Sequence, residues 1–374
     1  MKKRLRILLT GALAAATVGA FAAPAVAESH RLPHAVFVQT NAAAGNQVVA
    51  YDQRADGTLT LADTYSTGGN GGALNGAVVD RLASQGSLTF DAEHSLLYAV
   101  NAGSNTVSVF AVAGDRLALR EIVPSGGEFP VSVAVQHNLV YVLNARAGGS
   151  VSGYRVQDGV LRPIPGSTRP LGLDPAATPE FTSTPGQVGF SPDGRQLLVT
   201  TKGNGSNVDV FRVGDRGRLS AAPVVNNLPG AVPFAFDFDN EGNLVLSEAG
   251  PNAVVSFALH HDGNISPIAS AATGQAATCW VTHIGSHFYA SNAGSASLTQ
   301  VDSTDRGSLS FVANVATGPG TVDAAAAANG AYLYVQTGGN GGVNAFQVGP
   351  DGSLAPIGTV LVPNSVGGEG IVAV

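Results

Sequence analysis

The sequence predicts an all-β fold, a single seven-bladed β-propeller with four antiparallel strands per blade. Three observations carry this prediction: a repeated hairpin, a repeated Asp/Gly turn, and a further strand before each hairpin. The hairpin is clearest at 96–112, LLYAVNAGSNTVSVFAV, where two runs rich in Val, Tyr and Phe flank a polar turn. Such runs on either side of a turn are typical of a β-hairpin. The first strands of the seven copies end at Asn41, Asn101, Asn144, Thr201, Glu248, Asn292 and Thr337.

A turn built on Asp and Gly follows the second strand of every hairpin, as in Asp158-Gly159. Both residue types tolerate the positive φ that tight turns require. The turn recurs in seven of seven copies. We therefore expect a third strand to pair back onto each hairpin.

A further apolar strand precedes the hairpins, most clearly in PGQVGF at 185–190. Four strands per unit at a period of about 45 residues indicate the blades of a propeller. The chain begins with a hairpin and ends with a copy of the preceding strand. We therefore expect Gly368–Val374 to complete the blade begun at Ala35, which would cover strand edges that otherwise invite aggregation.

The N-terminus predicts export. Residues 1–27 combine a basic start, an Ala/Leu-rich apolar run and a small-x-small sequence at 25–27, the pattern of a cleaved secretory signal peptide. An uncleaved anchor is the alternative interpretation. We expect a short linker at 28–34, the propeller at 35–374 and a secreted, extracellular protein of bacterial type. Cys279 is the single cysteine, so we expect no internal disulfide.

Charge limits the classes of partner. Removing residues 1–27 takes away four basic and no acidic side chains, so the net charge falls from −7 to about −11. An acidic chain without a basic run does not match the phosphates of nucleic acid. No other segment reaches the length of a membrane span. We expect a monomer that binds a small molecule or another extracellular ligand.

Two connections between blades are longer than the others, at Gly68–Ser84 and Arg169–Thr184. Both join the outermost strand of one blade to the innermost strand of the next, so both belong to one face of the ring. Long loops on a rigid scaffold often carry function. The alternative is that they are tolerated insertions.

The repeat, the count of seven, the SPDG turn at Ser191–Gly194 and the signal peptide resemble the seven-bladed lactonase-like propellers. This family includes the bacterial propeller-type 6-phosphogluconolactonases. The resemblance implies an active-site pattern Gly-Pro-Arg-His on one inner strand and Asn-Glu one strand later. Here Pro233 and Glu248 match that pattern, whereas Phe234 and Ala235 replace the Arg and the His.

Glu248 is the candidate general base, because its equivalents in the other hairpins are Asn or Thr and a carboxylate can activate water. The alternative is a solvated acid at a loop edge. The inner strands line the central channel, and we expect it to hold substrate-orienting groups. The alternative is a narrow, merely hydrated channel. The candidate substrate-binding residues are Gln187, Trp280, Asp323 and Glu369 on inner strands and Asp80 and Arg81 in the first long loop.

The run containing Asp237, Asp239 and Glu241 nearly fits a calcium-binding loop. The alternative is an ordinary hairpin turn, because the run aligns with Phe190–Gly194 of another blade. We expect no cofactor otherwise, and no other metal site.

Two functions follow as hypotheses. The first is hydrolysis of a lactone or related cyclic ester at the mouth of the central channel. The second is non-catalytic binding or scaffolding by a propeller that has lost the family's Arg/His pair.

Overall fold

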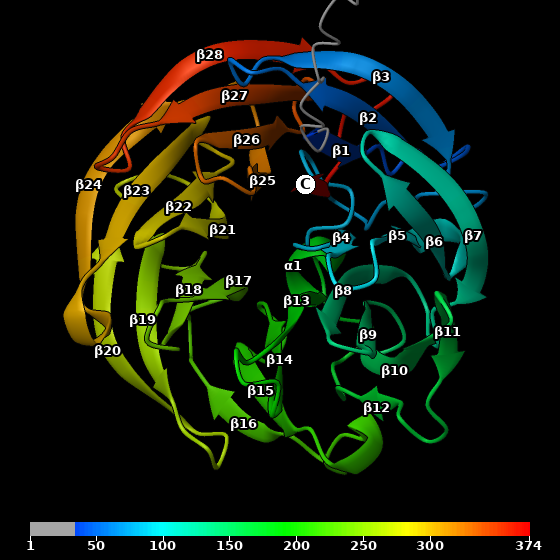
Figure 1. Ribbon diagram of the computed structural model, residues 1–374. Coiled ribbons are helices and arrows are strands. Elements are labelled where there is room, and N and C mark those ends of the chain that lie inside the picture. The colour runs from blue at the N-terminus through cyan, green and yellow to red at the C-terminus, as the bar shows by residue number, and fades with distance from the viewer. Residues whose placement is uncertain (1–33) are drawn as a thin grey trace, which may run out of the picture. The chain divides into compact units, whose positions relative to one another are not determined.

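The computed structural model describes residues 34–374. The predicted signal peptide and nearly all of the predicted linker lie outside the described residues. In this part of the chain, 29 strands form seven sheets arranged as blades around a central axis (Figure 1). The seven-bladed propeller with four antiparallel strands per blade is therefore confirmed.

The blades are numbered in chain order, and their strands are given from the axis outward. Blade 1 consists of β29 (Ile371–Ala373), β1 (Ala35–Gln39), β2 (Gln47–Gln53) and β3 (Leu59–Ser66). Blade 2 consists of β4 (Leu88–Asp91), β5 (Leu96–Asn101), β6 (Thr106–Ala113) and β7 (Arg116–Pro124). Blade 3 consists of β8 (Pro130–Gln136), β9 (Leu139–Asn144), β10 (Ser150–Gln157) and β11 (Val160–Pro163), with β12 (Arg169–Pro170) also paired to β10.

Blade 4 consists of β13 (Pro185–Phe190), β14 (Gln196–Thr201), β15 (Asn207–Arg212) and β16 (Val224–Asn227). Blade 5 consists of β17 (Pro233–Phe238), β18 (Leu244–Glu248), β19 (Ala253–Leu259) and β20 (Ile265–Ala272). Blade 6 consists of β21 (Thr278–Ile284), β22 (His287–Asn292), β23 (Ser297–Ser303) and β24 (Leu309–Ala316). Blade 7 consists of β25 (Thr321–Ala326), β26 (Tyr332–Thr337), β27 (Gly342–Val348) and β28 (Leu354–Leu361).

Helical structure is confined to short segments. The described residues contain α1 (Glu180–Ser183), η1 (Ala102–Ser104), η2 (Asp215–Gly217) and η3 (Asp305–Gly307). No helix among them has the length and apolar character needed to cross a membrane.

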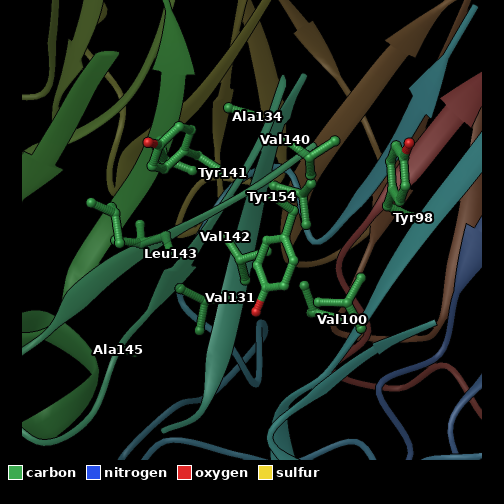
Figure 2. Close-up of a cluster of buried hydrophobic side chains, with 14 of the residues drawn as sticks. Tyr98, Val100, Val131, Ala134, Val140, Tyr141, Val142, Leu143, Ala145 and Tyr154 are labelled. Atoms are coloured by element: carbon green, nitrogen blue, oxygen red, sulfur yellow. The ribbon is translucent and has the colours of Figure 1, made fainter. Parts of the chain in front are cut away.

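The core lies between the blades. The second strand of a blade is packed on both faces, so all six residues of β5 are buried, whereas the outermost strand β3 is mostly exposed. Figure 2 shows one such cluster, in which Tyr98 and Val100 of blade 2 pack with Val131, Val140 and other side chains of blade 3. Burial of these apolar surfaces holds neighbouring blades together.

Several of the Asp/Gly turns tie a blade to the one before it. Tyr141 Oη donates to the carbonyl of Gly217 at 2.6 Å, Tyr289 Oη to that of Gly352 at 2.7 Å, and Tyr334 Oη to that of Gly57 at 2.9 Å. Gly57 has a φ of +80°, and a Cβ there would lie 2.3 Å from the ring of Tyr332. The turn needs Gly for both its conformation and this close approach.

The ring closes as predicted. Strand β29 pairs antiparallel with β1, with Ile371 opposite Val38 and Ala373 opposite Val36. Ala35 and Val374 exchange two backbone hydrogen bonds of 2.9 and 3.2 Å. The C-terminal strand thus becomes the innermost strand of the blade that the N-terminal strands began, and the blue and red ends of the chain share blade 1 in Figure 1.

Candidate functional site

The first long loop, Gly68–Ser84, fills one mouth of the central channel. We call the face that carries this loop the loop face, and the opposite face, which carries turns such as Ser191–Gly194, the turn face. Arg81 N–H donates to the carbonyl of Gly367 next to blade 1 at 2.9 Å. Trp280 Nε1 of blade 6 donates to the carbonyl of Ser84 at 2.7 Å. Lys202 Nζ, just after β14 of blade 4, donates to the carbonyl of Ala83. The loop is therefore fastened to three separate blades.

The second long loop, residues 169–184, contacts the first on the same face. Glu180 accepts a hydrogen bond from the backbone N–H of Asn75 at 2.6 Å. Its carboxylate also pairs with Arg146 Nε at 2.7 Å, and this guanidinium lies 4.2 Å from the centre of the Phe129 ring. The hydrogen bond from Arg146 lowers the pKa of Glu180. The pair therefore serves to hold the loops together.

Beneath the first loop lies a buried polar cluster formed by Asp80, Lys202, Asp323 and Glu369, none more than 5% exposed. The Asp80 carboxylate accepts the backbone N–H groups of Leu82 at 2.7 Å and Ser84 at 2.9 Å. Burial raises the pKa of Asp80 to about 6. Burial also lowers the pKa of Lys202 to about 7, although the charge of Asp80 opposes that shift. Asp80 and Lys202 each stabilise the charged form of the other, whereas burial disfavours both charged forms.

Asp323 and Glu369 form a carboxyl pair within this cluster. Glu369 Oε1 accepts the backbone N–H of Gly86 at 3.1 Å, while Oε2 is buried and receives no N–H or O–H donor. The Asp323 carboxyl lies within hydrogen-bonding reach of the Glu369 carboxyl. Burial raises the pKa of Asp323 to about 7, and burial together with the neighbouring acids raises that of Glu369 well above its usual range. Ionisation of both carboxyls together is disfavoured, because two like charges would lie close to each other in a buried site.

Of this pair, Asp323 lines a cavity that lies toward the turn face. This cavity of about 280 Å³ is lined by Asp323 together with Gln85, Thr89 and Gln187. It continues along β13 to Phe190, which directly precedes the turn at Ser191–Gly194. The channel is therefore open at the turn face and filled at the loop face.

The two glutamines of this cavity differ in how their amides are used. Gln85 both donates to and accepts from the backbone of Val281, at 2.8 and 3.0 Å. Gln187 Oε1 accepts the N–H of Phe236 at 2.7 Å, but its Nε2 donates to no described residue. Gln187 thus presents a fixed amide with a free N–H donor next to the channel.

Glu248 lies elsewhere. It ends β18, one strand outward from the channel wall, and lines a depression of about 620 Å³ beside Asn227 of blade 4 and Pro267 of blade 5. The carboxylate is half-buried and makes no hydrogen bond or ion pair with a described residue, and burial raises its pKa. No Lys or Arg lines this depression.

Of the remaining predicted site residues, Trp280 and Asp80 help close the loop face, and Arg81 lines a separate pocket there. Phe234 and Ala235, which replace the family's Arg and His, are core residues, and the Phe234 ring centre lies 4.8 Å from that of Trp280.

The acidic run of blade 5 makes protein contacts. Asp237 Oδ2 lies 2.8 Å from His283 Nδ1. Asp239 accepts the backbone N–H groups of Glu241 and Asn243 and so caps the turn. Within 34–374, no three His, Cys, Asp or Glu side chains converge as a metal site would require.

Sequence reasoning missed Lys202. The residue after each first hairpin strand is Ala or Gly in the six other copies, at positions 42, 102, 145, 249, 293 and 338. A buried lysine at this position lies 5.2 Å from the centre of the Phe234 ring and contacts the first loop. Comparing the last residue of each first hairpin strand singled out Glu248. Comparing the next residue in each copy singles out Lys202 in the same way.

Comparison with known proteins agrees with this architecture. The family model for the seven-bladed β-propeller lactonases matches residues 33–169 and 79–322. No curated protein sequence matches the chain.

Solved structures share the fold at low identity. A periplasmic gluconolactonase of Pseudomonas aeruginosa is 19% identical, with a TM-score of 0.72, over 91% of this chain and 99% of that one. A Bacteroides fragilis protein described as a candidate 6-phosphogluconolactonase is 20% identical, with a TM-score of 0.71, over 92% and 99%. A virginiamycin B lyase of Staphylococcus aureus is 13% identical, with a TM-score of 0.53, over 79% and 90%. On the family match and the seven closed blades, the chain belongs to the lactonase family of seven-bladed β-propellers.

Proposed function

We propose that this protein is exported and hydrolyses a small neutral lactone or cyclic ester in its central channel. One observation carries the proposal. One cavity, about 280 Å³ in volume, is lined by Asp323 and by Gln187, whose side-chain amide keeps an N–H donor not used by any described residue. A base and a hydrogen-bond donor beside one cavity are the minimum that ester hydrolysis requires.

The chemistry follows from these two groups. Asp323, as the carboxylate, removes a proton from a water molecule while the water oxygen attacks the lactone carbonyl carbon. Negative charge then develops on the carbonyl oxygen, and Gln187 Nε2–H donates to it. The ring C–O bond breaks, and the leaving oxygen takes up the proton held by Asp323. The product is a hydroxy acid, and the Asp323 carboxylate is restored.

The electrostatics of the channel select a neutral substrate. Asp323 lines the cavity, the buried acid Glu369 neighbours Asp323, and no Lys or Arg lines the cavity. A phosphorylated sugar lactone would bring like charge toward this pair, which costs binding energy. The proposal therefore favours an unphosphorylated substrate, and the hydroxy acid product is repelled once it ionises.

A second candidate is a propeller that binds a ligand without turnover. It is supported by the positions of Phe234 and Ala235, which are packed into the core where the family pattern has a cation and a histidine. Glu248 matches the family acid, but no Lys or Arg lines its depression. The side-chain amide of Asn227, which also lines it, already donates to Asn207.

The test is hydrolysis of a panel of neutral and phosphorylated lactones by the wild type and by Asp323→Asn, Gln187→Leu and Glu248→Gln. We expect turnover of a neutral lactone that Asp323→Asn reduces at least 100-fold and Glu248→Gln leaves unchanged. Loss with Glu248→Gln alone would assign the reaction to the outer depression. No turnover of any lactone, together with saturable binding, would support the non-catalytic candidate.

A further inference from the structure

A second pocket lies on the loop face, outside the filled mouth of the channel. Its volume is about 590 Å³, and it is bounded by the turn between β1 and β2, by Arg81 of the first long loop and by the segment before β29. It shares no lining residue with the channel cavity, which opens on the turn face. The proposed reaction does not use it.

Arg81 is fixed in this pocket at several points. Its backbone N–H donates to Gly367 and its carbonyl accepts from Leu74, at 2.9 and 2.8 Å. Its Nη1 donates to the carbonyl of Asn41 at 2.9 Å. The guanidinium is therefore held in place before any ligand arrives, which reduces the entropy lost on binding.

Gly367 makes room for the Arg81 side chain. It has a φ of +75°, and a Cβ at this position would lie 3.0 Å from Arg81 Cγ and 3.1 Å from Nε. The arginine stem thus lies flat against a glycine that has both an unusual backbone conformation and no side chain.

The charge of Arg81 has no counterion among the described residues. Arg81 forms no ion pair there, and no Asp or Glu lines the pocket. The pocket also contains further hydrogen-bond donors. The side-chain amides of Gln47 and Asn364 and the backbone N–H groups of Ala43 and Ala44 are not used in hydrogen bonds to described residues.

We propose that this pocket binds an oxyanion, the carboxylate or phosphate group of a small molecule. A guanidinium with free N–H groups matches the two oxygens of such a group, and the surrounding amides supply further donors. The pocket is separate from the channel cavity, because the two share no lining residue and open on opposite faces.

The experiment is calorimetric titration of the full chain at low ionic strength with sodium gluconate, inorganic phosphate and, as a neutral control, glucose. We expect saturable binding of at least one anion, no binding of glucose, and affinity that falls as NaCl is added. Binding of gluconate alone identifies a carboxylate site, and binding of phosphate alone identifies a phosphate site. Absence of binding by both anions at millimolar concentration overturns the proposal.

Variants separate this pocket from the rest of the surface. Arg81→Gln should weaken anion binding at least tenfold, whereas Arg195→Gln, which changes an exposed arginine in a turn-face hairpin, should not. If Arg81→Gln lowers the melting temperature, the double variant Gln47→Ala/Asn364→Ala is the test instead. We expect it to weaken anion binding several-fold. Equal affinity in the wild type and in both pocket variants overturns the proposal.

Discussion

The indole Nε1 of Trp280 donates a 2.7 Å hydrogen bond to the carbonyl of Ser84, and so joins the inner strand of blade 6 to the end of a loop nearly 200 positions earlier in the sequence. Trp280 is 4% exposed, and Ser84 is fully buried. The fold of the first long loop over the channel therefore depends on contacts made by the blades, because the loop contains no regular structure of its own.

Replacing Trp280 by Phe should destabilise the protein by about 2–4 kcal/mol. The change leaves the Ser84 carbonyl without its donor and opens space beside Phe234. Denaturant unfolding with an unchanged m-value would measure the loss. The matched control is Phe311→Leu on the exposed strand β24, which should cost no more than about 0.5 kcal/mol. Equal losses in the two variants would contradict the role given to the hydrogen bond.

Replacing Asp209 by Asn should stabilise the protein at neutral pH. Asp209 is 3% exposed, its Oδ1 has no hydrogen-bond partner, and burial raises its pKa to about 6. Because the folded protein holds this proton more tightly than the unfolded chain, stability is lost as the pH rises from about 4 to about 6. The cost at pH 7 is on the order of 2–3 kcal/mol.

Thermal or denaturant unfolding at several pH values checks this expectation. The variant should be more stable than the wild type at pH 7, and the difference should vanish near pH 3.5, where the wild-type carboxyl is protonated in both states. Other carboxyls are common to the two proteins, so the difference isolates Asp209. A variant that is less stable than the wild type at pH 7 would refute the assignment.

The proposed hydrolysis should depend on pH through Asp323. The base must be deprotonated, and burial raises its pKa to about 7. The ratio kcat/KM should therefore rise about tenfold per pH unit below neutrality and level off above it, after spontaneous hydrolysis is subtracted. In Asp80→Asn the midpoint should move to lower pH, because the negative charge of Asp80 raises the pKa of Asp323. A profile without an acidic limb would exclude Asp323 as the base.

Ending the chain at Val366 should abolish the soluble, cooperative fold. The truncation removes β29, exposes the paired edge of β1 and opens blade 1. Removing Val374 alone gives up its backbone exchange with Ala35 and one partly buried side chain but keeps β29, and that variant should stay soluble. Solubility and the cooperativity of melting are the measurements. A truncated protein that is soluble and melts in one sharp transition would show that closure is dispensable.

The repeat made the fold predictable in detail. Each hairpin is local in sequence, and the pairing of Asn101 with Thr106 follows from turn chemistry alone. The closure through Ile371 was also predictable, because a missing inner strand in the first blade and a surplus one at the end leave a single arrangement.

The site was predictable only in part. Gln187 and Asp323 were placed beside the channel because inner-strand positions follow from the period of the repeat. The path of the first loop depends on contacts such as Lys202 with Ala83, which no local pattern encodes. Glu248 stood out in the sequence, but it ends a second strand, so it lies about 4.8 Å outward from the wall that β17 forms.

Because the first long loop fills the loop-face mouth, the channel is open at one end only. If the proposed hydrolysis takes place there, substrate and product would enter and leave through the same opening beside Phe190. For a hydrolase of this shape, accumulated hydroxy acid would slow turnover by occupying the entrance. Once the product ionises next to two acids, the repulsion between like charges would favour its release.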